Sequence, residues 1–213
     1  MITTEDEARD WLRKLPECDE AAWVRLETLI AMLVEENRQQ NLVSAASLEQ
    51  VWLRHIVDSA QLLPYVSRET SRPWLDLGTG AGFPGLVVAA LRPECEVVMV
   101  ESRTRRIEWL DRARVAMGLD NARIAGQRLE LVESFPVNVI SARAFAPLEK
   151  LLTISARFST SDTVWLLPKG RSAKQELEDL RKWRHMFHVE QSLTDPQAGI
   201  IVGKLADRKG KTE

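Results

Sequence analysis

The amino-acid sequence predicts an α/β fold: a Rossmann-like, doubly wound sheet that is mainly parallel, with an antiparallel last strand and a helical N-terminal cap. From Pro73 onward, short runs rich in β-branched residues alternate with helical stretches, which is the pattern of βαβ units. A glycine-rich turn follows the first of these runs, where doubly wound sheets bind their ligands. We therefore divide the chain into a helical cap over residues 1–72, an α/β domain over 73–206 and a disordered tail over 207–213.

The cap is predicted from helical periodicity. Between Glu20 and Gln40, apolar residues recur at positions 23, 26, 29, 30, 33 and 34, close to the period of a helix. Ser47 is a candidate N-cap for a second helix that runs to Leu63, because a serine hydroxyl can accept a hydrogen bond from a free amide of the first turn. Pro64 would end that helix, since proline lacks the amide hydrogen that a helix interior needs.

Strands and helices alternate through the rest of the chain. The predicted strands lie at residues 73–77, 96–100, 122–125, 137–142, 162–167, 186–191 and 199–205. The predicted helices lie at residues 85–92, 103–118, 147–157 and 172–184. No helix separates the last two strands, and parallel neighbours need a long crossover, so we expect the final strand to be antiparallel.

Composition limits the kind of protein that this chain can be. It has 213 residues, of which 45% are hydrophobic and 28% are charged, enough for one sizeable core. No apolar run approaches the roughly 20 residues of a membrane span and no signal-peptide pattern is visible, so we expect a cytoplasmic protein. Cys18 and Cys95 lack metal-ligand spacing and are expected to be reduced. The net charge of −2 argues against indiscriminate coating of nucleic acid but leaves room for local basic patches.

The stretch WLDLGTGAGFPG, residues 74–85, raises the question of which ligand this turn holds. Read from Gly80, it fits the G-x-G-x-x-G pattern of dinucleotide-binding folds. Read from Asp76, it fits the acidic, glycine-rich loop expected around S-adenosylmethionine. Both cofactors carry an adenosine ribose, and Glu101 follows the loop by about 20 residues, where a carboxylate can accept the ribose hydroxyls. Glu101 therefore does not discriminate between the two cofactors.

Asp76 does discriminate between them. It would repel the anionic pyrophosphate of a dinucleotide, whereas it would attract the cationic amino-acid head of S-adenosylmethionine, directly or through water. The dinucleotide pattern also needs its first glycine directly after the strand, and counting from Gly78 places Phe83 where the third glycine belongs. We therefore predict S-adenosylmethionine as cofactor, in the fold of a class I methyltransferase, over a dinucleotide or a ligand-free turn. The contacts expected from the loop and the second strand are Asp76, Gly78, Gly80, Gly82 and Glu101.

Four stretches together carry a resemblance to a known family. RHIVDS (54–59), DLGTGAGFPG (76–85), ISARAFAPL (140–148) and LPKGRS (167–172) occur in this order. With them, the chain from about Asn41 to Lys174 resembles the glucose-inhibited division protein B family, the ribosomal RNA small subunit methyltransferases G. The glycine loop alone is shared by many methyltransferases, whereas the four stretches together are much more specific.

The resemblance implies a reaction and a cofactor site. The reaction is methylation of N7 of one guanine in a loop of 16S ribosomal RNA, which would be the partner, alone or within the small ribosomal subunit. The implied site consists of the glycine loop, Phe83, the pair Leu129 and Glu130, and Arg143. Leu129 stands where relatives usually have a smaller residue such as alanine, and we expect this position to act through its backbone beside the adenine. The first 40 residues carry no motif that we can match.

This chemistry needs little from the protein besides positioning. Guanine N7 carries an in-plane lone pair and no proton, so its attack on a sulfonium methyl needs no general base. The sequence lacks the Asn/Asp-Pro-Pro-aromatic run of many exocyclic-amine methyltransferases, because that place reads Ser141-Ala-Arg143-Ala-Phe145. Neither cysteine lies in a loop suited to pyrimidine C5 methylation, which needs a thiol nucleophile. We expect Arg143, at the end of the predicted fourth strand, to be catalytic by positioning, through the cofactor or guanine O6.

Two further groups of residues are candidates for RNA contact. One polar helix face consists of Arg54, His55, Asp58 and Ser59. From composition alone, Arg54 and Asp58 would form an ordinary surface ion pair. The resemblance instead implies that this face lies near the cofactor or contacts the RNA. Cationic residues that follow two predicted strands would contact phosphates or remain solvated: Lys169, Arg171, Lys174, Arg103, Arg105 and Arg106. Phe145 would either stack on a flipped guanine or belong to the core.

No metal is expected, because His185 and His188 lie on another predicted element without a partner carboxylate motif. Three other functions remain open at this point. The enzyme could act on another RNA, a small molecule or a protein; the chain could be a nucleotide-binding regulator without catalysis; or it could be a dinucleotide oxidoreductase. A basic rim around the site favours RNA, whereas the acidic pI of about 6.0 keeps the first alternative in view.

Overall fold

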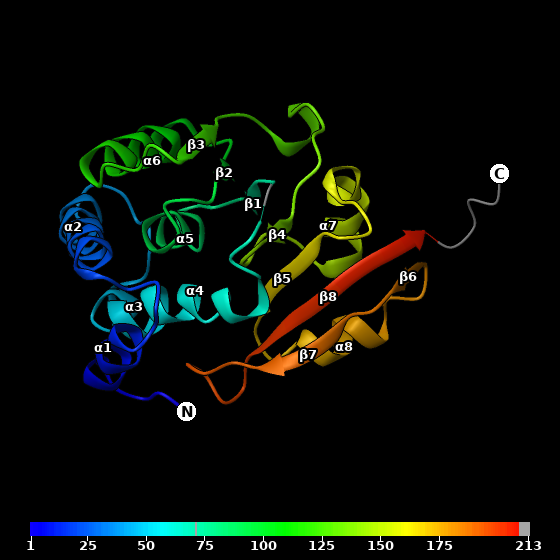
Figure 1. Cartoon of the computed structure of the whole chain (residues 1–213), viewed down its shortest axis with the longest axis horizontal. Coiled ribbons are helices and arrows are strands. Elements are labelled where there is room, and N and C mark those ends of the chain that lie inside the picture. The colour runs from blue at the N-terminus through cyan, green and yellow to red at the C-terminus, as the bar shows by residue number, and fades with distance from the viewer. Residues whose placement is uncertain (71, 209–213) are drawn as a thin grey trace.

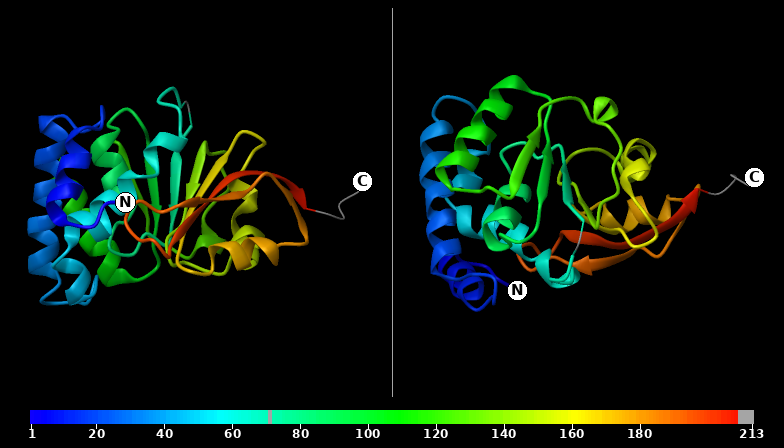
Figure 2. Two further views of the ribbon diagram at one scale, coloured as in Figure 1. Left: turned by 90° about the horizontal axis from the view of Figure 1, so that it is seen from below. Right: turned by 45° about the horizontal axis from the view of Figure 1, so that its top comes forward.

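The computed structural model describes residues 1–70 and 72–208, and it confirms a doubly wound α/β fold (Figure 1). A central sheet runs through the molecule, with helices on both of its faces (Figure 2). The strands are β1 (Trp74–Leu77), β2 (Val97–Val100), β3 (Ala122–Ala125), β4 (Val139–Ser141), β5 (Val164–Lys169), β6 (Trp183–His185), β7 (His188–Gln191) and β8 (Gly199–Arg208).

The strand order is β3-β2-β1-β4-β5-β8-β6, and β7 also pairs with β8. The first five strands pair in parallel, and β8 pairs antiparallel with β5, β6 and β7. The predicted antiparallel last strand is therefore confirmed. The chain reverses its winding between β1 and β4, so the carboxyl ends of these two strands form the switch point at which such sheets bind ligands.

The helices between the strands lie where the sequence predicts them, although the last one ends earlier than predicted. They are α5 (Gly85–Leu91), α6 (Thr104–Ala116), α7 (Leu148–Ser155) and α8 (Ala173–Glu178). In β1 the side chains alternate between two hydrophobic clusters, as a strand's period of two requires. Trp74 joins the cluster beneath α5 and α6, whereas Leu75 and Leu77 join the cluster beneath α7 and α8. Helices on both faces bury the central parallel strands β1, β2 and β4 completely.

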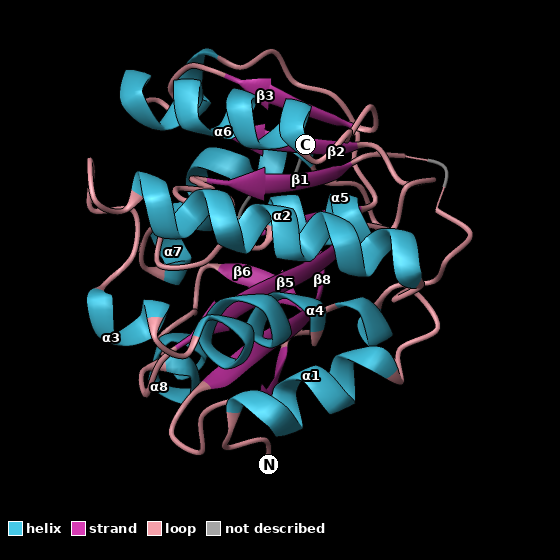
Figure 3. Ribbon diagram, turned by 90° about the vertical axis from the view of Figure 1, so that its left-hand side faces the viewer, coloured by secondary structure: helices cyan, strands magenta, loops and turns pink. Residues whose placement is uncertain are grey.

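The cap consists of α1 (Glu5–Arg13), α2 (Glu20–Glu36), α3 (Ala45–Leu48) and the helical turns that follow them. Figure 3 shows α2 lying along the face formed by α5 and α6, against which it packs. Between α1, α2 and the next turn, Trp23 stacks on Trp52 at a centroid distance of 4.6 Å, and the guanidinium of Arg13 covers Trp23 at 3.9 Å. One continuous apolar cluster thus joins the cap to the sheet.

A single regular helix from Ser47 to Leu63 was predicted, and this prediction is wrong because the segment consists of several short helical pieces. Ser44, not Ser47, is the N-cap, and it accepts from the backbone of Ser47. The chain then forms a π-helix, η1 (Trp52–Val57), a short α4 (Asp58–Ala60) and a 3-10 turn, η2 (Leu63–Tyr65), which contains Pro64. A π-turn is rare and often marks a functional site, because it redirects side chains that a regular helix would separate.

Two expectations near the C-terminus also change. The predicted helix 172–184 ends at Glu178, and residues 183–185 form β6 instead, because they pair with the end of β8. Residues 207 and 208, expected in a disordered tail, continue β8 opposite β6. Residues 209–213 of the expected tail lie outside the described residues.

No helix in the described part of the chain is long and apolar enough to cross a membrane.

Candidate functional site

The loop between β1 and α5 is shaped by three glycines at the carboxyl end of the central strand. Gly78, Gly80 and Gly82 have φ angles of 62°, 62° and 101°, a region that other residues rarely adopt. A Cβ atom on Gly78 would overlap the ring of Phe145, and one on Gly82 would overlap Leu86. Glycine is therefore required here both by backbone conformation and by close approach.

Asp76 fixes this loop through hydrogen bonds from the end of β1. Its side chain is fully buried, with 0% exposure; one carboxylate oxygen accepts from the Ser141 hydroxyl at 2.8 Å and the other from the Gly85 amide at 3.0 Å. Burial raises the pKa of this carboxyl despite the hydrogen bonds, which lower it. Asp76 thus contacts the loop and the neighbouring strand; the expected attraction of a cationic ligand, directly or through water, stays a prediction.

Glu101 lies at the end of β2, across from the loop. Its carboxylate accepts from the backbone amides of Gly80, Ser102 and Arg103 at 3.2, 2.7 and 3.0 Å. Together with Leu129 it lines a cavity of about 250 Å³, which we call the smaller cavity. Its other lining residues include Gly78, Arg103, Arg106, Gln127, Ala144 and Phe145.

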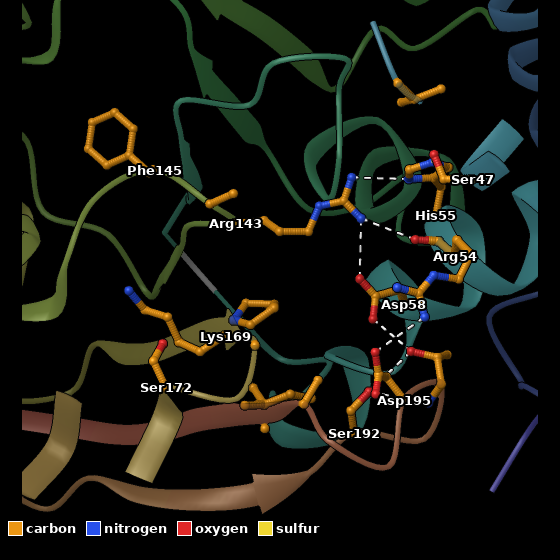
Figure 4. A pocket seen from close by; sticks show the side chains of 18 of the residues that line it. Ser47, Arg54, His55, Asp58, Arg143, Phe145, Lys169, Ser172, Ser192 and Asp195 are labelled. Carbon is orange, nitrogen blue, oxygen red and sulfur yellow. Dashed lines mark hydrogen bonds and ion pairs between the residues drawn. The ribbon is translucent and has the colours of Figure 1, made fainter. Parts of the chain in front are cut away.

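Arg143 follows β4 and is held by three acceptors, two from the π-helix η1 and one from the first residue of α4 (Figure 4). Its guanidinium donates to the backbone carbonyl of Arg54 at 3.3 Å and to the carboxylate of Asp58 at 3.2 Å. Its other terminal nitrogen lies 3.2 Å from Nδ1 of His55. The carbon at its centre lies 5.3 Å from the ring of Phe83. Four separate groups therefore determine where this cation points.

His55 is buried between these groups. Its ring stacks on Phe83 at 4.8 Å, and Nε2 lies 3.0 Å from the hydroxyl of Ser47. Burial, together with the charges of Arg143 and Arg54, lowers the pKa of His55 to about 3. The imidazole is therefore neutral near pH 7. Because arginine only donates, Nδ1 must be the acceptor and Nε2 carries the hydrogen that is donated to Ser47.

The second oxygen of Asp58 ties this cluster to the C-terminal part of the chain. It accepts from the Thr194 hydroxyl at 2.8 Å and from the Gln61 side chain at 2.9 Å. Next to it, Arg54 pairs with Asp195 at 3.4 Å. The loop before β8 is thus bound to the same helical turn that holds the cation after β4.

These groups line a second cavity of about 760 Å³, which we call the larger cavity. Its lining includes Arg54, His55, Asp58, Arg143, Phe145, Lys169 and Asp195. Ala144 and Phe145 line both cavities, so the segment after β4 forms the partition between them.

Lys169 lies at the end of β5 and points inward, with 10% of its side chain exposed. Its ammonium group donates to the carbonyl of Ala146 and pairs with Glu176, both at 2.8 Å. Glu176 also accepts from the amide of Leu148 at 2.8 Å. Lys169 therefore supports the segment after β4, whereas we expected it either to contact RNA phosphates or to remain solvated.

The remaining predicted residues lie in different places. Arg103 and Arg106 line the smaller cavity, whereas Arg105 donates to the carbonyl of Gln39 in the cap. Arg171 and Lys174 are exposed near the larger cavity. Arg171 lies between Gly170 and Ser172, which line this cavity, and Lys174 follows two residues later. Glu130 is exposed beside Arg128, with which it pairs. Ser59 is buried and donates to the carbonyl of His55.

Comparison with known proteins identifies the family. The family model described as rRNA small subunit methyltransferase G matches residues 23–197. A ribosomal RNA small subunit methyltransferase G of Erythrobacter litoralis is 60% identical over 96% of this chain and 98% of its own length. One of Novosphingobium aromaticivorans is 59% identical over 96% and 90%. This chain belongs to the ribosomal RNA small subunit methyltransferase G family. The resemblance carried by the four sequence stretches is confirmed.

Solved structures agree on the fold. A mutant of MtNAS in complex with S-adenosylmethionine matches with a TM-score of 0.57 at 14% identity, covering 94% of this chain and 84% of that one. A SAM-dependent methyltransferase from Aquifex aeolicus also gives 0.57 at 14% identity, covering 79% and 97%. At this identity the likeness concerns architecture alone.

Several residues of the family member's site were not predicted from the sequence. They are Ser47, Ser141, Glu176, Ser192, Thr194 and Asp195. Ser141 had a usable signal, because it ends a strand that pairs in register with Asp76. The segment 192–195 carries no motif, and only its return beside Asp58 brings it into the cavity. Among the described residues, no group of three or more His, Cys, Asp and Glu side chains is placed to hold a metal ion.

Proposed function

We propose that this protein transfers a methyl group from S-adenosylmethionine to N7 of a specific guanine in 16S ribosomal RNA. The observation that carries the proposal is the pair of cavities that share one wall at the switch point of the sheet. Glu101 lines one of them and Arg143 the other, and Ala144 and Phe145 line both. A donor and an acceptor held in such neighbouring cavities would meet at the end of β4, in a member of a ribosomal RNA methyltransferase family.

The residues of the smaller cavity fit the adenosine part of the cofactor. Glu101 already accepts hydrogen bonds from three backbone amides, which leaves lone-pair capacity for a ribose hydroxyl. Leu129 and Gly78 offer apolar contact for a base.

Asp76 supports that site indirectly. By accepting from Gly85 and Ser141, it fixes the loop in the conformation that brings the glycine backbone against the cavity. Its role is therefore to hold the loop in place.

When bound, S-adenosylmethionine supplies a methyl group on a positively charged sulfur. Guanine N7 has no proton to lose, so the protein needs to align the two reactants and exclude water. Arg143 is permanently charged and is oriented by His55 and Asp58, and it can donate to guanine O6. Phe145 presents a planar ring on which an unpaired base can stack.

RNA would approach over the mouths of the two cavities. Arg54, Arg103 and Arg106 line them, and Arg171 and Lys174 are exposed close by. These cations would contact phosphates on either side of the target nucleotide. With a net charge of −2 the whole molecule has little general attraction for RNA, which favours a folded substrate such as the small ribosomal subunit in the cytoplasm.

The test uses purified protein, tritiated S-adenosylmethionine and small subunits or ribosomal RNA from a strain that lacks this gene. We expect label in one 16S fragment, released by cleavage chemistry that is specific for 7-methylguanine. Cofactor binding without labelled RNA would refute this acceptor, whereas labelled RNA that resists the cleavage would refute N7 as the acceptor atom.

A further inference from the structure

The ring of Phe145 lies directly on the glycine loop. A Cβ atom placed on Gly78 would overlap Cδ2 of this ring and lie 2.8 Å from Cε2, so the ring contacts the Gly78 backbone itself. Gly78 lines the smaller cavity, and Phe145 lines both cavities. The ring therefore stands between the place assigned to the donor and the place assigned to the acceptor.

Methyl transfer cannot proceed across such a partition. The reacting atoms of a near-attack arrangement lie about 3–3.5 Å apart, closer than the thickness of an intervening aromatic ring would allow. The two cavities must therefore become continuous at Gly78 before the reaction, and the ring must leave the position in which the structure shows it.

The segment that carries the ring is anchored at both ends. On one side, Arg143 is bound to Asp58 and His55. On the other, Lys169 holds the carbonyl of Ala146, and Glu176 holds the amide of Leu148. Between these anchors, Phe145 is only partly buried and Ala144 is exposed. The ring can thus turn while the cation after β4 and the start of α7 keep their places.

We propose that Phe145 is a gate between the two cavities, opened by the cofactor and then used to hold the acceptor base. In the closed position the ring rests on Gly78. Cofactor binding displaces it toward the larger cavity, where its face becomes available for stacking. The inference rests on the proposed function, because it assigns the donor to the smaller cavity and the acceptor to the larger one.

The gate makes an unusual prediction: the same side chain opposes binding of the donor and supports binding of the acceptor. Removing the ring in Phe145→Ala frees the space above Gly78, so S-adenosylmethionine should bind more tightly, up to about tenfold if the closed position is nine-tenths populated. The same variant loses the stacking surface, so KM for the small subunit should rise by about tenfold.

The experiment measures the dissociation constant of S-adenosylmethionine by calorimetry without RNA, and separately the KM for small subunits. Phe135→Ala is the matched control, because Phe135 is another half-buried phenylalanine of the same hydrophobic cluster that is not part of either cavity lining. It should change neither constant. Thermal melting establishes that each variant is folded.

Opposite changes in the two constants would support the gate. Weaker or unchanged cofactor binding in folded Phe145→Ala would overturn it, because a wall residue or a direct cofactor contact gives that result. The calorimetric titration does not depend on the acceptor, so a wrong RNA substrate leaves this part of the test intact. A wild-type protein that binds no S-adenosylmethionine would instead overturn the proposed function, and the gate with it.

Discussion

His55 shows how a residue without access to solvent can serve a cavity. It lies in a segment that we expected to meet RNA, yet only 6% of its surface is exposed and both ring nitrogens are engaged. An imidazole that stays neutral is the right partner for Arg143, because a protonated one would repel the guanidinium. Its role is that of a positioning residue, and this role has a consequence for the pH dependence of folding.

The stability of the protein should fall as the pH falls from 7 to 5. The pKa of His55 is about 3 in the folded protein and 6.5 in the unfolded chain. Between pH 7 and pH 5, only the unfolded chain therefore takes up a proton at this imidazole. Linkage then removes about 2 kcal/mol of unfolding free energy between pH 7 and pH 5. Urea unfolding at several pH values measures it, with His55→Gln as the comparison.

The Gln variant retains an acceptor and a donor but does not titrate. Its unfolding free energy should therefore lose about 2 kcal/mol less than the wild type over the same interval. Parallel profiles for the two proteins would contradict the assignment of a buried, neutral imidazole.

Arg143 is the second residue whose environment leads to a prediction. Three acceptors match the planar fork of a guanidinium, and an ammonium group cannot satisfy them in the same geometry. Arg143→Lys should retain the fold but lose roughly 100-fold in the rate of methyl transfer, since small misplacements of a positioning group have effects of that size. Single-turnover kinetics with saturating cofactor measures this rate.

A matched substitution is Arg123→Lys, at an exposed arginine on β3 that pairs with Glu96. It should leave the single-turnover rate unchanged. A rate for Arg143→Lys within a few-fold of that control would show that the fork geometry is unimportant.

At the scale of elements, the β1–α5 loop and the end of α6 offer a controlled comparison. Gly80 and Gly118 have nearly the same backbone conformation, with φ of 62° and 63°. Alanine at either position should lower the free energy of unfolding by about 1–2 kcal/mol, because a residue with a Cβ atom is strained in the left-handed backbone conformation. Only at Gly80 would the new atom meet a neighbour, Arg106 at 3.3 Å, beside the smaller cavity.

We therefore expect Gly80→Ala to weaken S-adenosylmethionine binding by about tenfold or more, and Gly118→Ala to leave it unchanged at similar loss of stability. Calorimetry together with thermal melting separates the two effects. Equal affinities for S-adenosylmethionine in the two variants would show that the glycine loop is not part of the cofactor site.

The elements themselves were predicted to different degrees. Strands β1 to β5 and helices α5 and α6 follow from the alternation of short β-rich runs with helical stretches, since these apolar runs become the buried elements of the fold. The breaks at η1 and β6 do not follow from it. The π-turn is stabilised by contacts with Arg143 and with the carboxylate of Glu5, which accepts from the amides of Trp52 and Leu53. Residues 183–185 become a strand only because β8 lies beside them.

At the scale of the whole molecule, the charge distribution determines how an RNA would be held. Arg171 and Lys174 are exposed, whereas Lys169, the last residue of β5, is already paired with Glu176. Replacing both exposed residues by glutamine should lower the slope of log affinity against log salt by roughly 2, because each phosphate contact contributes about one. Filter binding of small subunits at several salt concentrations measures this slope.

The affinity for S-adenosylmethionine should not change in this double variant, since neither residue lines the smaller cavity. Lys14→Gln, at the end of α1 and outside both cavity linings, serves as the control for loss of a surface charge. An unchanged slope of log affinity against log salt in the double variant would show that the RNA does not contact Arg171 and Lys174.

By itself, the sequence determined the fold class, the family and the loop that marks the switch point. These depend on local order: the alternation of apolar runs, the glycines after β1, and four short stretches whose residues are neighbours along the chain. It also placed Glu101 and Arg143 at strand ends, because parallel strands end at a common edge.

Only the tertiary structure decided how those residues are used. Asp76 and Ser141 are far apart in the chain and meet because β1 and β4 are neighbours in the sheet. Lys169 turns inward because Ala146 and Glu176 surround it. Whether a polar side chain faces a ligand or supports a loop depends on partners that a chain acquires only when it folds, since a buried donor or acceptor must be satisfied by whatever lies beside it.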